Sequence, residues 1–257
     1  MVDSPSSRTP ERAGVVTGAA SGIGRATALH LLHDGVAVIA VDINPAAADE
    51  LQSAGAQFVQ ADVASPEGRA AVAAAARALP RGLSHVVNAA GVIDVTAPLR
   101  VTVEGFRRVF SVNVEGLYFL TQELEPLLND GASIVNLSSS SAKLTTTVEV
   151  APYAASKAAV LSLTRTLALT LAPRRIRVNA ICPGIVDTPM ERSVLAGVGA
   201  VRGIPVDQLS EGRDASVPLG RGSAPEEVAG AIAFLLSDAA AYITGEAMNF
   251  SGGQVVW

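Results

Sequence analysis

The sequence predicts an α/β protein: a single-domain Rossmann fold with one doubly wound, seven-stranded parallel sheet and helices on both faces. Two observations predict it. Short apolar runs rich in β-branched residues alternate with helical stretches along the 257-residue chain, and continuously apolar strands are typical of a parallel sheet buried on both faces. A glycine-rich turn, Gly18 to Gly24, joins the first strand to the first helix, as in a dinucleotide-binding βαβ unit.

The expected elements follow from local pattern. Ser65 and Pro66 are suited to the N-cap and the first position of a helix that ends near residue 79. Other helices are expected at 25–34, 102–128, 154–172 and 225–236. Strands are expected at 13–17, 36–41, 56–60, 85–88, 133–137, 176–181 and 247–250.

Three regions of the chain differ in character. Residues 1–12 are polar and rich in Pro and Ser, so we expect a flexible N-terminal tail and no signal peptide. Residues 13–257 are expected to form one catalytic domain. Within it, residues 188–217 are interspersed with glycines and mixed in polarity, with no clean period. A long segment without firm structure in a compact domain is usually a functional lid.

Composition excludes several classes of function. The net charge is −5, so no basic surplus favours nucleic acid or an anionic membrane surface. A single cysteine, Cys182, excludes an intramolecular disulfide and fits a cytoplasmic protein. The three histidines and this cysteine are scattered, so we expect no metal site.

The Gly18–Gly24 turn favours dinucleotide binding over an ordinary tight turn. Missing side chains let the backbone approach a pyrophosphate, and the following helix offers unpaired N–H groups and the positive end of its dipole. Asp42 ends the second strand, where a carboxylate accepts ribose hydroxyls and repels a 2′-phosphate; the alternative is a loop cap. Asp62 and Val63 are expected beside the adenine in the same way.

The cofactor is therefore expected to be NAD and not NADP. A 2′-phosphate would need a nearby positive charge, and the residues at these places carry none. They are Ala19, Ala20 and Ser21 in the turn and Ile43 after Asp42.

Tyr153 and Lys157 stand at i and i+4 at the start of an apolar helix, which places them side by side. A fixed cation favours the phenolate, so we expect a lowered pKa for Tyr153 and proton exchange with an alcohol or ketone. Taken alone, the pair more often means a lysine that reaches solvent.

Asn88 to Gly91 ends the fourth strand, at the switch point where ligands bind. Asn113 is either a buried amide satisfied locally or a residue that also holds a water near Lys157.

In this order the motifs resemble the short-chain dehydrogenase/reductase family, over essentially the whole of 13–253. The matching elements are Thr17 to Gly24, Asn88 to Gly91, Asn113, Asn136 to Ser139, Tyr153 with Lys157, Pro183-Gly184, and Ser251 to Gly253. The resemblance implies hydride transfer between a nicotinamide and a carbinol carbon. It implies Asn113, Ser139, Tyr153 and Lys157 as the catalytic set. The implied cofactor-binding residues are Gly18, Ser21, Gly22, Ile23, Gly24, Asp42, Ile43, Asp62, Val63, Asn88, Ala89, Gly91, Tyr153, Lys157, Pro183, Gly184, Val186 and Thr188.

The chain departs from the family pattern at two places. The first concerns the catalytic serine, which the family usually places thirteen residues before the tyrosine. That spacing selects Ser140, whereas the position relative to the end of the preceding strand selects Ser139. We favour Ser139 because a strand end is rigid. Asn249 to Ser251 stands where many members carry an Asp.

The expected function is NAD-dependent oxidation of a secondary alcohol, such as a small polyol, diol or cyclic alcohol, or reduction of the ketone. A dehydrogenase of a cyclic dihydrodiol is an alternative, and a non-catalytic NAD-binding regulator is a rival of another class.

The 154–172 and 102–128 helices are apolar nearly all round, which predicts burial against symmetry mates unless residues 188–217 cover them. With the resemblance, this predicts a homotetramer, or at least a dimer.

Overall fold

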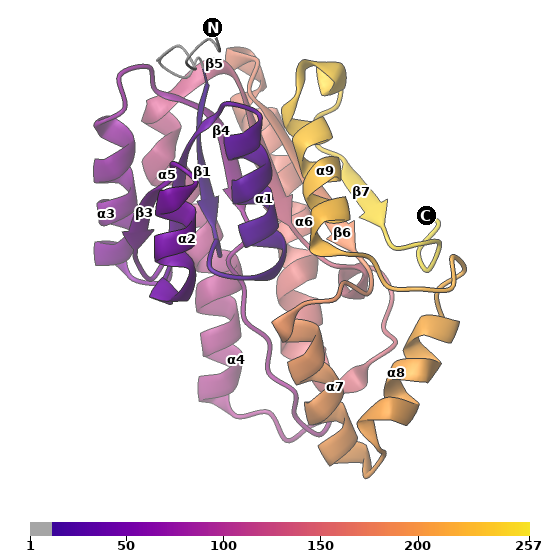
Figure 1. Ribbon diagram of the computed structural model, residues 1–257. Coiled ribbons are helices and arrows are strands. Elements are labelled where there is room, and N and C mark those ends of the chain that lie inside the picture. The colour runs from indigo at the N-terminus through magenta and orange to yellow at the C-terminus, as the bar shows by residue number, and fades with distance from the viewer. Residues whose placement is uncertain (1–11) are drawn as a thin grey trace, which may run out of the picture.

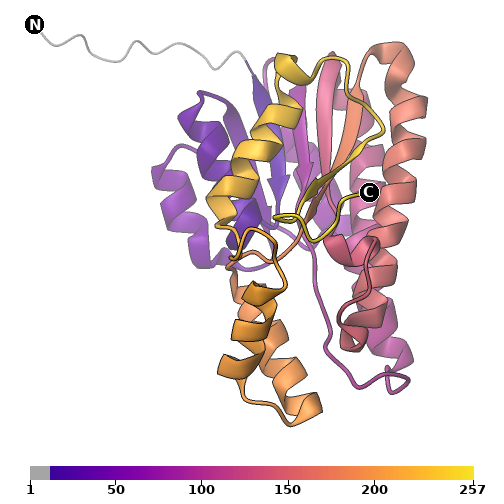
Figure 2. The ribbon, with the colours of Figure 1, turned by 90° about the vertical axis from the view of Figure 1, so that its right-hand side faces the viewer.

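The computed structural model describes residues 12–257, so the expected tail at 1–12 lies outside it except for Arg12 (Figures 1 and 2). Seven strands form one parallel sheet in the order β3-β2-β1-β4-β5-β6-β7. The strands are β1 (Ala13–Thr17), β2 (Ala37–Asp42), β3 (Gln57–Gln60), β4 (Leu83–Asn88), β5 (Leu128–Leu137), β6 (Arg177–Pro183) and β7 (Ala247–Phe250). The predicted doubly wound sheet is confirmed, and its order reverses between β1 and β4.

Helices cover both faces of the sheet (Figure 1). One face carries α1 (Gly22–His33), α2 (Ala48–Ser53) and α9 (Pro225–Leu236); the other carries α3 (Pro66–Arg77), α5 (Leu117–Leu124) and α6 (Ala151–Leu171). A further helix, α4 (Val103–Phe110), packs beside α6. Ser65 caps α3 as expected, because its hydroxyl accepts a hydrogen bond from the amide of Gly68.

Alternate residues of each central strand enter different cores. Val15 and Val86 pack with α3, α5 and α6, whereas their neighbours Val16 and Val87 pack with α1 and α9. All four are fully buried. This period of two follows from side chains that point to opposite faces of a strand, and it explains why the central strands are apolar at every position.

The expectation that residues 188–217 lack firm structure is wrong. They form α7 (Pro189–Arg202) and α8 (Val206–Ala215), which project beyond the carboxyl ends of the strands (Figure 2). The glycines that suggested a loop serve close packing instead: a β-carbon on Gly197 would lie 2.8 Å from Cβ of Val95. Gly203, at φ +67°, ends α7 in the left-handed conformation that glycine adopts at little cost.

The single helix expected at 102–128 is interrupted. Between α4 and α5 the chain makes a π-helical segment, Ser111–Gly116, which contains Asn113. Such wide turns inside helices often occur at functional sites.

His85 on β4 is a buried imidazole whose Nδ1 has no hydrogen-bond partner among the described residues. Burial, aided by the positive charges of Arg12 and Arg177, lowers its pKa from 6.5 to about 4. As the pH falls from about 6.5 to about 4, the unfolded chain binds a proton that the folded chain excludes. The free energy of unfolding should therefore fall by up to about 3 kcal/mol in that window.

Chemical denaturation at several pH values measures this. We expect His85→Gln to lose less stability than the wild type between pH 6.5 and 4, and His33→Gln to behave as the wild type because the His33 side chain is 90% exposed. Identical pH profiles for His85→Gln and the wild type would contradict the assignment.

Candidate active site

The turn between β1 and α1 is shaped by glycines where another backbone passes. A β-carbon on Gly18 would lie 2.8 Å from the carbonyl oxygen of Ala89, and one on Gly24 would lie 2.2 Å from the carbonyl oxygen of Gly18. Ser21 at the N-cap makes no side-chain cap, and the first turn of α1 holds no acidic residue. The N-terminal amides of α1 and the positive end of its dipole are therefore available to an anion.

Asp42 stands at the end of β2, where its carboxylate is oriented by the backbone. One oxygen accepts a hydrogen bond from the amide of Ala20 and the other from that of Asn44, each at 2.9 Å. Carboxylate oxygens have further lone pairs for hydroxyl donors. Arg25 on α1 forms an ion pair with Glu50 on α2.

Two cavities lie along the carboxyl ends of the strands. The Asp42 cavity, of about 500 Å³, is lined by predicted residues that include Gly18, Ser21, Gly22, Gly24, Asp42, Ile43, Asp62 and Val63. The Tyr153 cavity, of about 440 Å³, is lined by Ser139, Tyr153, Lys157, Pro183, Gly184 and Val186 among others. Ile23, Ala89, Gly91 and Thr188 line both, so the two cavities adjoin each other at the switch point of the sheet.

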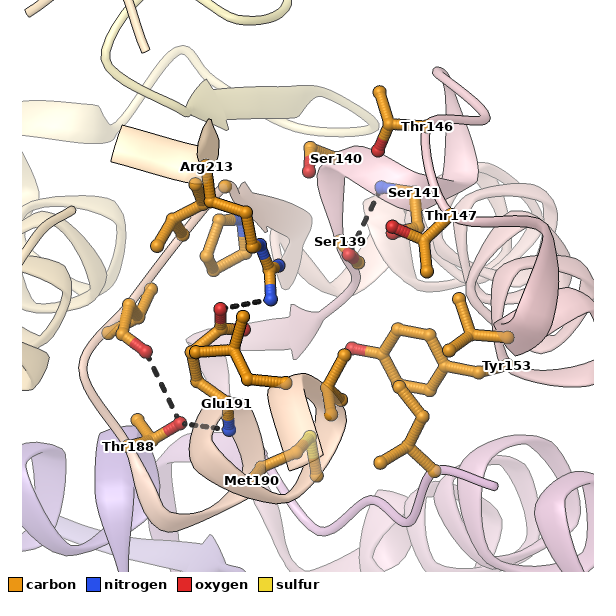
Figure 3. Close-up of a pocket in the computed structure, with 18 of the residues that line it drawn as sticks. Ser139, Ser140, Ser141, Thr146, Thr147, Tyr153, Thr188, Met190, Glu191 and Arg213 are labelled. Carbon is orange, nitrogen blue, oxygen red and sulfur yellow. Dashed lines mark hydrogen bonds and ion pairs between the residues drawn. The ribbon is translucent and has the colours of Figure 1, made fainter. Parts of the chain in front are cut away.

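Ser139 and Tyr153 share the Tyr153 cavity (Figure 3). Ser139 follows β5, is 8% exposed, and accepts a hydrogen bond from the amide of Ser141. The Ser139 side chain acts to lower the pKa of the Tyr153 phenol. Both Ser139 and Ser140 line the cavity, so the choice of Ser139 as the reacting serine stays a prediction.

Lys157 does not lower the pKa of Tyr153 in this structure, contrary to expectation. Burial raises the pKa of Tyr153 to about 12, against a smaller lowering by Ser139. Burial also lowers the pKa of Lys157 to about 8. The Lys157 ammonium lies 5.6 Å from the centre of the Tyr153 ring and donates its hydrogen bond to the carbonyl oxygen of Leu137, at 2.7 Å.

Two predicted asparagines have their side chains outside these cavities. The amide of Asn113 is satisfied by Val92, whose backbone N–H and carbonyl it bonds at 2.8 and 3.0 Å, and by the hydroxyl of Ser156. Asn88 donates to Thr121 and Asn136 in the buried space between β4, β5 and α5. The Asn113 amide is thus satisfied by local groups, as one reading of the sequence expects, and a role in holding a water stays a prediction. At Asn88 the backbone is the part expected to face the cofactor, and this also stays a prediction. A β-carbon on Gly91 would nevertheless lie 3.4 Å from both Asn113 Oδ1 and Lys157 Nζ.

Sequence reasoning missed the charged residues of the Tyr153 cavity. Glu191, Arg202 and Arg213 come from α7 and α8 and line it together with Lys157. Their only sequence signal was the mixed polarity of residues 188–217. Within residues 12–257, no group of His, Cys, Asp and Glu side chains could hold a metal ion.

Known proteins match the chain over nearly its full length. A family model described as enoyl-(acyl carrier protein) reductase matches residues 18–254. The cis-4-hydroxycyclohexanecarboxylate dehydrogenase of Sinomonas cyclohexanicum is 39% identical, over 95% of this chain and 96% of its own. The chain belongs to the short-chain dehydrogenase/reductase family.

Other family members differ in substrate and cofactor. The NAD-dependent glycerol dehydrogenase of Listeria innocua is 32% identical, over 96% of this chain and 94% of its own. An actinorhodin polyketide ketoreductase solved with NADPH is 32% identical, with a TM-score of 0.89 over 97% of this chain and 99% of its own. The present protein is thus an oxidoreductase for a small-molecule substrate, from a family whose members use nicotinamide cofactors. None of the described helices is both long and apolar enough to cross a membrane.

Proposed function

We propose that this protein is an NAD-dependent dehydrogenase of a small secondary alcohol: a polyol, a diol or a cyclic alcohol. The proposal rests on one observation above all. The cavity that holds Ser139 and Tyr153 adjoins the cavity that contains Asp42, and the two share lining residues such as Ala89, Gly91 and Thr188. The cyclic-alcohol and glycerol dehydrogenases among the relatives support this substrate range.

The residues present fit an NAD molecule along these two cavities. The Gly18–Gly24 turn would hold the pyrophosphate, because added side chains there would collide with neighbouring backbone. Asp42 would accept the hydroxyls of the adenosine ribose, and Asp62 with Val63 would flank the adenine. The backbone of Ala89 and Gly91, with Pro183, Gly184, Val186 and Thr188, would line the remaining length of the cofactor. When bound, the nicotinamide accepts a hydride from the alcohol or donates one to the ketone.

Tyr153 acts on the proton of the reacting oxygen. With a pKa raised to about 12, it holds its proton at neutral pH and donates it to the developing alkoxide of a ketone. In the opposite direction it must first lose that proton. Ser139 donates a hydrogen bond to the same oxygen and stabilises the charge that develops on it. Lys157, whose ammonium lies 5.6 Å from the centre of the Tyr153 ring, would hold the nicotinamide ribose.

Formation of NADH with a panel of secondary alcohols, polyols and cyclic dihydrodiols tests this function. We expect turnover of at least one member of the panel with NAD. Binding of NAD without turnover of any alcohol, and without reduction of the matching ketones by NADH, would favour a non-catalytic NAD-binding protein instead.

The Asp42 carboxylate should make NAD the preferred cofactor. Asp42→Ala removes the acceptor of the ribose hydroxyls and the charge that repels a 2′-phosphate, so we expect about tenfold weaker NAD binding or more. The variant should also show a smaller preference of NAD over NADP. Titration calorimetry with both cofactors measures the change, and Asp49→Ala is a matched control because Asp49 is exposed and does not line the cavity. Equal affinity of the wild type for NAD and NADP contradicts the Asp42 argument.

The outer helix faces support a homo-oligomer. Residues 188–217 lie beyond the strand ends and leave α5 and α6 uncovered (Figure 2). Exposed apolar side chains include Phe119 on α5, Leu169 on α6 and Phe106 on the neighbouring α4. The exposed side of α6 also carries Arg165 and Ser162, so it is less uniformly apolar than expected.

We expect these faces to meet symmetry mates in a tetramer, or at least a dimer, with a second contact through α9 and β7. Light scattering at assay concentration checks this. A stable, active species of 26.2 kDa would refute it.

A further inference from the structure

Arg213 brings a positive charge into the Tyr153 cavity from the outer helix α8. Figure 3 shows its guanidinium pointing into the cavity, toward Ser139 and beside Glu191. The Arg213 side chain is 30% exposed, and Nη1 pairs with one carboxylate oxygen of Glu191. Among residues 12–257, no other acidic side chain pairs with Arg213. Because a guanidinium has five N–H donors, most of its donors remain available to a molecule in the cavity.

The other arginine of the cavity is engaged differently. Arg202 on α7 donates through Nε and Nη2 to both oxygens of Glu149, at 2.7 and 2.8 Å. The Glu149 side chain is 5% exposed. This bidentate ion pair occupies two N–H donors of the Arg202 guanidinium and both carboxylate oxygens of Glu149. Arg202 therefore serves to fasten α7 to the chain before α6, and it provides a natural comparison for Arg213.

The charges around the cavity leave an excess of positive charge. Three basic residues line it, Lys157, Arg202 and Arg213, against one acid, Glu191. Glu149 offsets Arg202 from outside the cavity lining. Glu191 is itself largely buried, at 17% exposure, and burial raises its pKa. An incoming anion that replaces Glu191 on Arg213 is thus favoured over a cation that binds Glu191.

Part of the cavity wall suits an apolar body. The apolar lining includes Ile93, Val150, Val194, Leu195, Val198 and Leu209, the last four of which come from α7 and α8. An anionic group buried among such residues needs a charged hydrogen-bonding partner. Arginine binds carboxylate well because its planar fork matches the two oxygens.

We propose that the substrate is a hydroxy acid, or the matching oxo acid, whose carboxylate binds Arg213 while its carbinol oxygen lies at Ser139 and Tyr153. Arg213 is then the residue that determines specificity. Glu191 holds Arg213 in place and competes with the substrate carboxylate for it. This inference rests on the proposed function in one respect, that the Tyr153 cavity is where the alcohol binds.

Binding of two ligands without a hydroxyl group tests the inference apart from turnover. Cyclohexanecarboxylate and cyclohexanecarboxamide have nearly the same size and differ in charge. By titration calorimetry in the presence of NAD, we expect the carboxylate to bind the wild type at least about tenfold more tightly than the carboxamide, as a charged hydrogen-bonded pair predicts. Because neither ligand can be oxidised at a carbinol carbon, the result is decided even if every alcohol in the panel is inert.

Three variants locate the effect. Arg213→Gln should abolish the preference for the carboxylate, whereas Arg202→Gln should keep it. Glu191→Gln should bind the carboxylate severalfold more tightly than the wild type, because the competing acid is gone; a purely structural ion pair predicts weaker binding instead.

Each opposite result overturns the inference: equal binding of the two ligands by the wild type, a preference that survives Arg213→Gln, equal losses in Arg213→Gln and Arg202→Gln, or weaker carboxylate binding by Glu191→Gln. Thermal unfolding of each variant verifies that the outer helices remain folded.

Discussion

Replacement of Tyr153 by Phe should lower kcat by about 10²- to 10⁴-fold, the range that a positioned acid or base contributes. The phenol oxygen acts on a proton in the transition state, so its loss should leave the affinity for NAD within about twofold of the wild type. Steady-state kinetics and calorimetric NAD titration measure the two effects. Tyr242→Phe is the matched control, because Tyr242 is fully exposed and lies outside the Tyr153 cavity.

Lys157→Ala should impair both turnover and NAD binding. The ammonium is expected to serve the nicotinamide ribose as well as the phenol, and it also satisfies the carbonyl oxygen of Leu137. The contrast between Tyr153→Phe and Lys157→Ala separates the proton role from the binding role. An ordinary kcat for Tyr153→Phe would contradict the mechanism.

Replacement of Ser139 by Ala should cost at least about a hundredfold in kcat. A hydrogen bond to a developing oxyanion supplies on the order of 3 kcal/mol in a buried site, and Ser139 is buried and lines the same cavity as Tyr153. Ser140→Ala is the matched control one residue further on, and it should cost far less. The reverse order of the two variants would show that the family spacing, and not the end of β5, determines the reacting serine.

The parts of the protein that sequence predicted are those set by local rules. The order of strands and helices follows from continuously apolar runs, and the turn after β1 follows from glycines that no other residue can replace without a clash at Gly18 or Gly24. The positions of Asp42, Ser139 and Tyr153 follow because the ends of parallel strands and the start of α6 meet at one edge of the sheet.

The parts that sequence did not predict depend on tertiary packing. Gly197 looked like a loop residue, but in α7 it provides room for Val95. Arg213 and Glu191 are 22 positions apart in sequence and meet only because α7 and α8 fold against each other. The pKa of Tyr153 was expected to be lowered by an i, i+4 lysine, but burial raises it and also lowers the pKa of Lys157. The Asn88 side chain joins two strands to α5, which no local pattern in the sequence indicated.

Transfer of deuterium from substrate to cofactor tests the central claim most directly. A secondary alcohol from the panel, deuterated at its carbinol carbon, is incubated with NAD and the wild type or Tyr153→Phe, and the reduced cofactor is analysed by mass spectrometry. We expect the wild type to form one singly deuterated NADH for each ketone produced, and Tyr153→Phe to form almost none while it still binds NAD. Ketone formed without deuterium in the cofactor, or equal transfer by the two proteins, would contradict hydride transfer assisted by Tyr153.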